Sequence, residues 1–202
     1  VAVISPFNFP LAIGPFWCAA PALVEGNTVI IKPSEDAPWS TQAAVEIYHE
    51  AGIPAGVLQV VHGDGLVGSL LTGEDVDHIC FTGSAEVGQL IRQEAAKSWH
   101  KTTSCEMGSK SACIVFDDAD IDMAVDAAIA SAFKLSGQRC VSSGRMIVQR
   151  DVYDEFCKKF VAKASELETG NPFNDDGNVN ADMYYGPIVN KQGFDKVVKY
   201  ND

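Results

Sequence analysis

Short runs of β-branched and apolar residues alternate along this chain with longer segments whose apolar residues recur at helical spacing. In the first half the pattern predicts buried strands at residues 1–4, 28–31, 57–61 and 78–81. It predicts helices between them at residues 39–51, 67–71 and 85–97. This order of strand and helix indicates an α/β fold with a mostly parallel sheet covered by helices on both faces. Such sheets bind ligands at the carboxyl ends of their strands.

The same pattern begins again after residue 101. Strands are predicted at 102–106, 112–116 and 146–149, helices at 121–135 and 152–167, and a polar loop at 168–185. Asp120 is a suitable residue to begin the helix at 121. Because two strands of different surroundings meet near Gly108, we expect one unit over residues 1–107 and another over 108–202.

Composition excludes several classes of protein. The chain has 202 residues, of which 47% are hydrophobic and 21% charged, so it is typical of a globular protein. A formal net charge of −12 argues against a nucleic-acid surface. The apolar stretch at 11–23 is interrupted by Gly14, Pro15 and Pro21 and is shorter than the roughly 20 residues that cross a bilayer, so no membrane partner is expected.

The cysteines and histidines predict no metal site. The six cysteines contain no C-x-x-C pair, which indicates reduced thiols and a cytoplasmic location. The four histidines are scattered, without the spacing of metal ligands.

Cys140 differs from the other cysteines because glycine, glutamine and arginine precede it rather than an apolar run. Free cysteines are usually buried and inert. An adjacent arginine, here Arg139, favours the nucleophilic thiolate form. Glu106, upstream, is a candidate base that activates water. A thiolate and a base together can form a thioester and then hydrolyse it.

Two segments have the pattern of anion-binding turns. Residues 81–84 (Phe-Thr-Gly-Ser) end a strand and begin a helix, where backbone N–H groups and the Ser84 hydroxyl suit a diphosphate. Alternatively, Ser84 is only a helix N-cap. Residues 63–68 spell G-x-G-x-x-G between a strand and a helix, but three ordinary turn glycines would produce the same letters.

Two further loops follow predicted strands. In residues 32–35 (Lys-Pro-Ser-Glu), Lys32 and Glu35 could hold ribose hydroxyls, or they form an incidental ion pair in a solvated turn. Asn8 lies between two phenylalanines, and its amide could donate to an oxyanion or close a turn before Pro10.

In combination, these motifs closely resemble the NAD(P)-dependent aldehyde dehydrogenase superfamily. The boxes that carry the resemblance, in family order, are residues 6–10, 32–35, 81–84, 106–110 and 137–140. The resemblance implies a Rossmann-like cofactor-binding domain over 1–107 and the start of an α/β catalytic domain over 108–202. Ser109 departs from the family, which most often has glycine there, and the family's downstream Glu-x-Phe-Gly-Pro box is absent, so a central fragment is expected.

The resemblance also implies roles for individual residues. Cys140 would attack an aldehyde, Asn8 and the Cys140 backbone N–H would stabilise the oxyanion, and Glu106 would activate the water that releases the acid. Lys32 and Glu35 would bind the adenosine ribose of NAD, with NADP as a less favoured cofactor because of the Glu35 carboxylate, and Ser84 would bind the diphosphate. The other cofactor-binding residues expected are Ser34, Gly65, Phe81, Thr82, Gly83, Met107 and Gly108.

The resemblance implies a small-molecule aldehyde as substrate and a homodimer or homotetramer as the assembly. Two other functions stay open. One is a CoA-acylating semialdehyde dehydrogenase, against which Glu106 argues, because such enzymes generally lack that base. The other is a non-catalytic structural descendant of the family.

Overall fold

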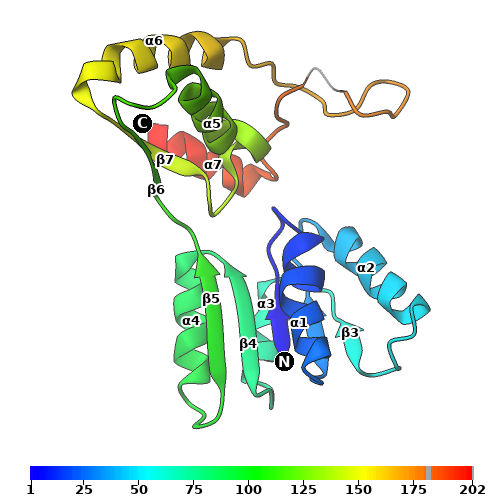
Figure 1. Ribbon diagram of the computed structural model, residues 1–202. Coiled ribbons are helices and arrows are strands. Elements are labelled where there is room, and N and C mark those ends of the chain that lie inside the picture. Colours follow the sequence, from blue (N-terminus) through cyan, green and yellow to red (C-terminus); the bar gives the residue numbers. More distant parts are fainter. Residues whose placement is uncertain (181–182, 202) are drawn as a thin grey trace. The chain divides into compact units, whose positions relative to one another are not determined.

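The chain divides into two units, Val1–Gly108 and Ser109–Asp202, in a computed structural model that describes residues 1–180 and 183–201 (Figure 1). The division falls beside Gly108, where the two predicted units adjoin.

The first unit is built on a five-stranded parallel sheet with the order β3-β2-β1-β4-β5. Its strands are β1 (Ala2–Ile4), β2 (Val29–Lys32), β3 (Leu58–Val60), β4 (His78–Gly83) and β5 (Thr102–Met107). Its helices are η1 (Ala12–Ala19), α1 (Ala20–Val24), α2 (Pro38–Glu50), α3 (Gly65–Gly73) and α4 (Ala85–Ala95). The parallel α/β fold predicted from the alternating pattern is therefore confirmed.

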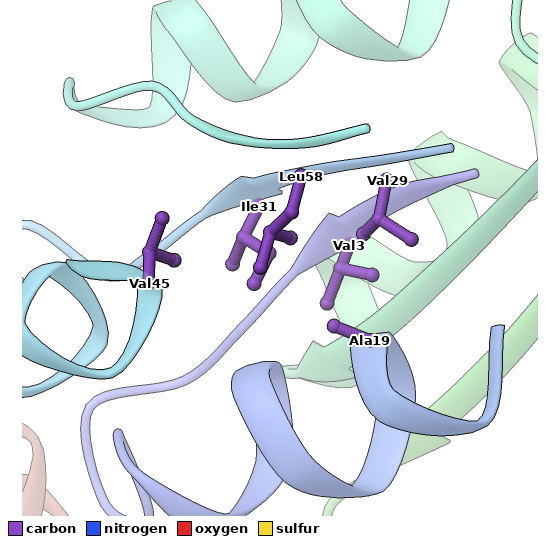
Figure 2. Close-up of a cluster of buried hydrophobic side chains, with 6 residues drawn as sticks. All are labelled: Val3, Ala19, Val29, Ile31, Val45 and Leu58. Carbon is purple, nitrogen blue, oxygen red and sulfur yellow. The ribbon is translucent and has the colours of Figure 1, made fainter. Parts of the chain in front are cut away.

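Helices cover both faces of this sheet, and a separate hydrophobic cluster lies under each face. One cluster consists of Val3, Ala19, Val29, Ile31, Val45 and Leu58, and Figure 2 shows Ala19 and Val45, from helices, beside the strand residues. The other consists of Ala2, Leu71, Ile79, Phe81 and Ile91. Alternate residues of a strand point to opposite faces, so neighbours such as Ala2 and Val3 belong to different clusters. Each large aliphatic side chain buried in this way stabilises the fold by about 1.5–3 kcal/mol.

The apolar segment at 11–23 folds into two consecutive helices that the sequence analysis does not predict. Ala12–Ala19 is a π-helix that contains Pro15, and α1 follows with Pro21 in its first turn. Proline lacks an N–H, and it is tolerated in a first helical turn, where that donor has no partner. Gly14 is required in η1 because a Cβ there would lie 2.9 Å from the Ser5 Oγ. No helix of the described residues is long and apolar enough to cross a membrane.

The second unit contains a two-stranded parallel sheet and helices that pack on it. Its elements are β6 (Ser111–Val115), α5 (Ile121–Phe133), η2 (Lys134–Gly137), β7 (Ser143–Val148), α6 (Arg150–Ser165) and α7 (Lys191–Asn201). As predicted, Asp120 begins α5, and its carboxylate accepts the Met123 N–H at 3.0 Å. The buried core residues are Val115, Val125, Ala128, Ile129 and Phe156. Helices α5 and α6 are also joined by ion pairs, one of them from Lys159 to Asp122 at 2.8 Å.

Candidate functional site

The loops predicted to bind a ligand follow the carboxyl ends of parallel strands, so they share one edge of the first unit's sheet. Ile4 of β1 pairs with Lys32 of β2 and with Phe81 of β4, and Thr82 of β4 pairs with Glu106 of β5. Figure 1 shows the arrows of β4 and β5 ending at the same edge. The strand order reverses direction between β1 and β4, and open α/β sheets bind ligands at such a point.

Lys32, the last residue of β2, and Glu35, in the loop that follows it, form a partly buried ion pair. The Lys32 side chain is buried, its ammonium donates to the Pro33 carbonyl at 2.8 Å, and it lies 3.6 Å from the Glu35 carboxylate. Its stem passes beside Gly68 of α3. Glu35 is largely exposed, so one of its oxygens remains accessible to a hydroxyl-bearing ligand.

A pocket of 530 Å³ adjoins this pair. Ser34 and Glu35, which the sequence analysis predicts, contribute to its lining, together with Trp39, Gln42 and His62. His62 and Gln42 are joined by a side-chain hydrogen bond of 2.9 Å. The last three residues were not predicted. The one feature of the sequence that could have indicated this pocket is Trp39, a large aromatic residue at the start of a predicted helix. In the structure the Trp39 side chain is 79% exposed.

Ser84 begins α4, and both interpretations of this residue remain open in the structure. Its hydroxyl accepts the Val87 N–H at 3.3 Å, which is the N-cap contact, while its side chain is exposed at the helix N-terminus. An N-cap hydroxyl can still donate its proton to an anion. Ser84 is therefore available to a phosphate without loss of the cap.

At this edge of the sheet, a ligand would meet the backbone rather than the side chains of Phe81, Gly83 and Met107. The side chains of Phe81 and Met107 pack into the cluster beneath α3 and α4. A Cβ on Gly83 would lie 2.5 Å from the Phe81 ring, and one on Gly88 would lie 2.6 Å from the Met107 sulfur. Glycine at these positions lets the strands and α4 approach closely.

In the G-x-G-x-x-G segment the glycines have different surroundings. Gly63 has a φ of +155°, and a Cβ there would lie 2.3 Å from Val67, whereas Gly65 faces open space. Asp64 caps α3 by accepting the Leu66 N–H at 2.9 Å. Gly63 therefore shapes the turn, while nothing about Gly65 requires a glycine.

Asn8 lies in the loop after β1 and is half-buried. Hydrogen bonds hold both ends of this loop: the Ser5 N–H donates to Lys32 at 3.0 Å, and the Thr41 hydroxyl donates to the Pro10 carbonyl at 2.8 Å. The loop is thereby attached to β2 and α2.

Glu106 is exposed at the end of β5. It lines a hollow of 690 Å³ on the face of the sheet that η1 and α1 cover, together with Ser104, Thr82 and His78. The neighbouring residues Cys105 and Met107 pack on the opposite face. An exposed carboxylate at the rim of a hollow can accept a proton from water.

Cys140 lies half-buried in the loop between η2 and β7 of the second unit. The Arg139 guanidinium donates to the carbonyls of Ala130 and Ser131 at 2.8 and 2.7 Å. These two hydrogen bonds attach the loop that carries Cys140 to the end of α5. The position of Arg139 next to Cys140 in the sequence did not indicate this structural role.

The approach to Cys140 has an unusual backbone conformation. Leu135, Ser136 and Gly137 have φ values of +55°, +58° and +70°, and non-glycine residues seldom adopt this region. Long-range contacts hold it: the Ser136 hydroxyl donates to Gly186 at 2.6 Å, and the Val189 N–H donates to Gln138 at 2.9 Å. Strain maintained by surrounding contacts is typical of functional loops.

Among the described residues there is no group of three or more His, Cys, Asp or Glu side chains arranged to hold a metal ion. The first unit brings together the loops of Asn8, Lys32, Ser84 and Glu106, and Cys140 belongs to the second unit.

The family model described as the aldehyde dehydrogenase family matches residues 1–202. Among solved structures, an aldehyde dehydrogenase from Brucella melitensis biovar abortus is 41% identical with a TM-score of 0.89, and the match covers 98% of this chain and 40% of that one. Betaine aldehyde dehydrogenase from Staphylococcus aureus in complex with NAD+ is 33% identical with a TM-score of 0.92, covering 100% and 39%. An NADP-dependent enzyme of E. coli is 40% identical with a TM-score of 0.90, covering 99% and 40%. This chain thus spans about 40% of the length of these structures.

Proposed function

Because this chain belongs to the aldehyde dehydrogenase family, we propose that it takes part in the NAD(P)-dependent oxidation of an aldehyde to a carboxylic acid. The observation that carries the proposal is the family match over residues 1–202, a span that includes Asn8, Glu106 and Cys140. The activity is proposed for the whole protein, since the chain spans about 40% of its relatives' length.

The first unit has groups that fit a nicotinamide dinucleotide. Lys32 and Glu35 can bind ribose hydroxyls, since the carboxylate is exposed beside a buried ammonium. The exposed Ser84 and the N-terminal amides of α4 can bind the diphosphate, and the absence of a side chain at Gly83 leaves the backbone approachable. When bound, the dinucleotide supplies the acceptor for the hydride that leaves the substrate. The NAD+ complex and the NADP-dependent enzyme among the relatives support NAD, with NADP as the alternative.

Cys140 is the proposed nucleophile. Its thiolate attacks the aldehyde carbon, and the carbonyl oxygen becomes an oxyanion that the Asn8 amide and the Cys140 backbone N–H stabilise. Oxidation of this thiohemiacetal leaves a thioester on Cys140. The tie from Arg139 to α5 keeps the cysteine loop in place throughout.

Glu106 is the proposed base for hydrolysis. Its carboxylate takes a proton from water, the resulting hydroxide attacks the thioester carbon, and the acid leaves as the Cys140 thiolate is restored. Exposure of Glu106 at the rim of a hollow supports this role because water can reach it there.

The test is dinucleotide reduction by the full-length protein with a panel of small-molecule aldehydes, with NAD and NADP in parallel. Cys140→Ala should abolish reduction, whereas Cys157→Ala, a change on α6, should retain it. Reduction by Cys140→Ala at the wild-type rate would refute the proposal and favour the non-catalytic alternative. Product analysis with and without CoA separates the acid-forming reaction from the acylating one.

The family also favours a cytoplasmic homodimer or homotetramer for the whole protein. Light scattering after size-exclusion chromatography would check the assembly, and a monomer would contradict it.

A further inference from the structure

Three polar side chains form a hydrogen-bonded chain along the pocket of 530 Å³ that adjoins Glu35. The Gln42 amide nitrogen donates to the Glu46 carboxylate at 2.7 Å, and the Gln42 amide oxygen lies 2.9 Å from Nε2 of His62. All three side chains line the pocket. Gln42 and Glu46 lie one turn apart on α2, and His62 follows β3, so the chain joins a helix to a loop at the carboxyl edge of the sheet.

The hydrogen-bonded chain determines which ring nitrogen of His62 is available to a ligand. An ionised carboxylate only accepts hydrogen bonds, so Glu46 must face the amide nitrogen of Gln42, and the amide oxygen must face His62. Nε2 of His62 therefore carries a proton and donates it to Gln42. Within the described part of the chain, Nδ1 of His62 makes no hydrogen bond. Nδ1 is thus a free acceptor when the ring is neutral and a free donor when the ring is positively charged.

Backbone pairing places His62 beside the loop of Glu35. The N–H of Val61 donates to the carbonyl of Ile31 at 2.9 Å, so the segments that follow β2 and β3 begin side by side. Ser34 and Glu35 line the same pocket as His62. The pocket therefore adjoins the residues proposed to bind the adenosine ribose, and a substituent on that ribose can enter it.

The charged groups around His62 determine whether the pocket accepts an anion. Glu35 and Glu46 line it, and both carboxylates repel a phosphate. The ammonium of Lys32, 3.6 Å from Glu35, offsets part of this repulsion, while Asp64, which is close to His62 in the sequence, caps α3. With a neutral His62, the pocket therefore disfavours a phosphate. A positive charge on the imidazole opposes the repulsion, and histidine is the side chain that gains such a charge between about pH 8 and 5.

We propose that His62 is a specificity-determining residue that makes the choice between NAD and NADP depend on pH. The inference rests on the proposed function, because it takes Glu35 as a ribose-binding residue. The 2′-hydroxyl of NAD can donate to the Glu35 carboxylate or to Nδ1 of a neutral His62. The 2′-phosphate of NADP has no proton to give to Glu35, but it accepts a charge-assisted hydrogen bond from Nδ1 of a protonated His62. Binding of NADP relative to NAD therefore strengthens as the pH falls.

The test is calorimetric titration of the full-length protein with NAD and with NADP at about pH 6 and about pH 8. In the wild type, the affinity for NADP relative to NAD should fall with rising pH by about tenfold more than in His62→Gln, which stays neutral and can still donate to Gln42. The comparison between variants is needed because the 2′-phosphate itself loses a proton at about pH 6. The matched control His100→Gln, just before β5 at the opposite edge of the sheet, should behave as the wild type does.

A second substitution at the same position tests whether the charge is what matters. Arginine is positively charged at every pH used, so His62→Arg should bind NADP relative to NAD at about pH 8 as well as the wild type does at about pH 6. Equal pH dependence in the wild type and His62→Gln, or a His62→Arg variant that behaves like His62→Gln, would overturn this inference and leave the proposed function intact. Binding of neither dinucleotide by the wild type would overturn both.

Discussion

At the scale of single residues, the candidate site depends on close approaches that only glycine permits. The Phe81 ring is buried against Gly83, and Met107 is packed against Gly88, so two residues expected to contact a dinucleotide also form the core below it. A rigid ring cannot move aside as a flexible side chain can. The backbone at this edge is thus held by the same contacts that stabilise the sheet.

We therefore expect Gly83→Ala to destabilise the protein by about 1–3 kcal/mol, because its methyl group would overlap the Phe81 ring. The matched control is Gly65→Ala, since a Cβ at Gly65 meets nothing within 4 Å. Urea unfolding of the two full-length variants measures the difference. A Gly83→Ala midpoint equal to that of Gly65→Ala would contradict the packing described.

Arg139 illustrates a residue whose role the sequence could not indicate. Its position beside Cys140 suggested that its charge promotes the thiolate, but its guanidinium donates to the carbonyls of Ala130 and Ser131. Adjacent residues in a loop can point in different directions, and only the fold determines which partner a long side chain reaches.

The two hydrogen bonds from Arg139 predict that Arg139→Lys loosens the loop around Cys140. Lysine keeps the positive charge but lacks the planar guanidinium that donates to two carbonyls at once. Hydrogen bonds to a charged group contribute about 1.5–3 kcal/mol, so amide hydrogen exchange in residues 134–142 should accelerate roughly tenfold or more. Exchange in α4, of the first unit, serves as the internal control. Unchanged exchange in the cysteine loop would show that the arginine does not hold it.

At the scale of elements, the strands of the first unit were predicted to within about two residues, because apolar runs of this length between turns leave few alternatives. The π-helix η1 was missed because Gly14 and Pro15 indicate a break, and the Ser5 side chain against which Gly14 packs lies outside the helix. Helix α3 begins at Gly65, two residues before the predicted start at Val67, because the Asp64 carboxylate caps it. Helix caps and close packing between distant segments depend on three-dimensional geometry, which the spacing of apolar residues along the sequence does not reveal.

The N-termini of α3 and α4 offer a paired test of the diphosphate site. Ser84→Ala and Asp64→Ala each remove an N-cap, so each should cost about 1 kcal/mol of stability. Only Ser84 is proposed to contact the diphosphate, so Ser84→Asp, which keeps a cap but adds negative charge, should weaken dinucleotide binding about tenfold or more. Calorimetric titration measures the affinities. Equal weakening by Asp64→Ala, or none by Ser84→Asp, would place the diphosphate elsewhere.

At the scale of the whole molecule, the parallel sheet is what made the candidate site predictable. Once the strands are parallel, the loops of Asn8, Lys32, Ser84 and Glu106 must share an edge, whatever the details of their side chains. Side-chain directions were beyond such reasoning, since the side chains of Phe81 and Met107 face the core. Glu106 belongs to the first unit and Cys140 to the second. Their proposed cooperation in one reaction therefore has to be tested in the whole protein.

The most direct measurement is covalent trapping in full-length Glu106→Gln, which keeps the shape of the side chain but removes the base. With an aldehyde and the dinucleotide, this variant should release about one equivalent of reduced dinucleotide in a burst and then stall. Peptide mapping should find the acyl group on Cys140, and Glu106→Gln combined with Cys140→Ala should give neither burst nor adduct. Turnover by Glu106→Gln at the wild-type rate, or an adduct on another residue, would contradict the assignment of Cys140 as nucleophile and Glu106 as base.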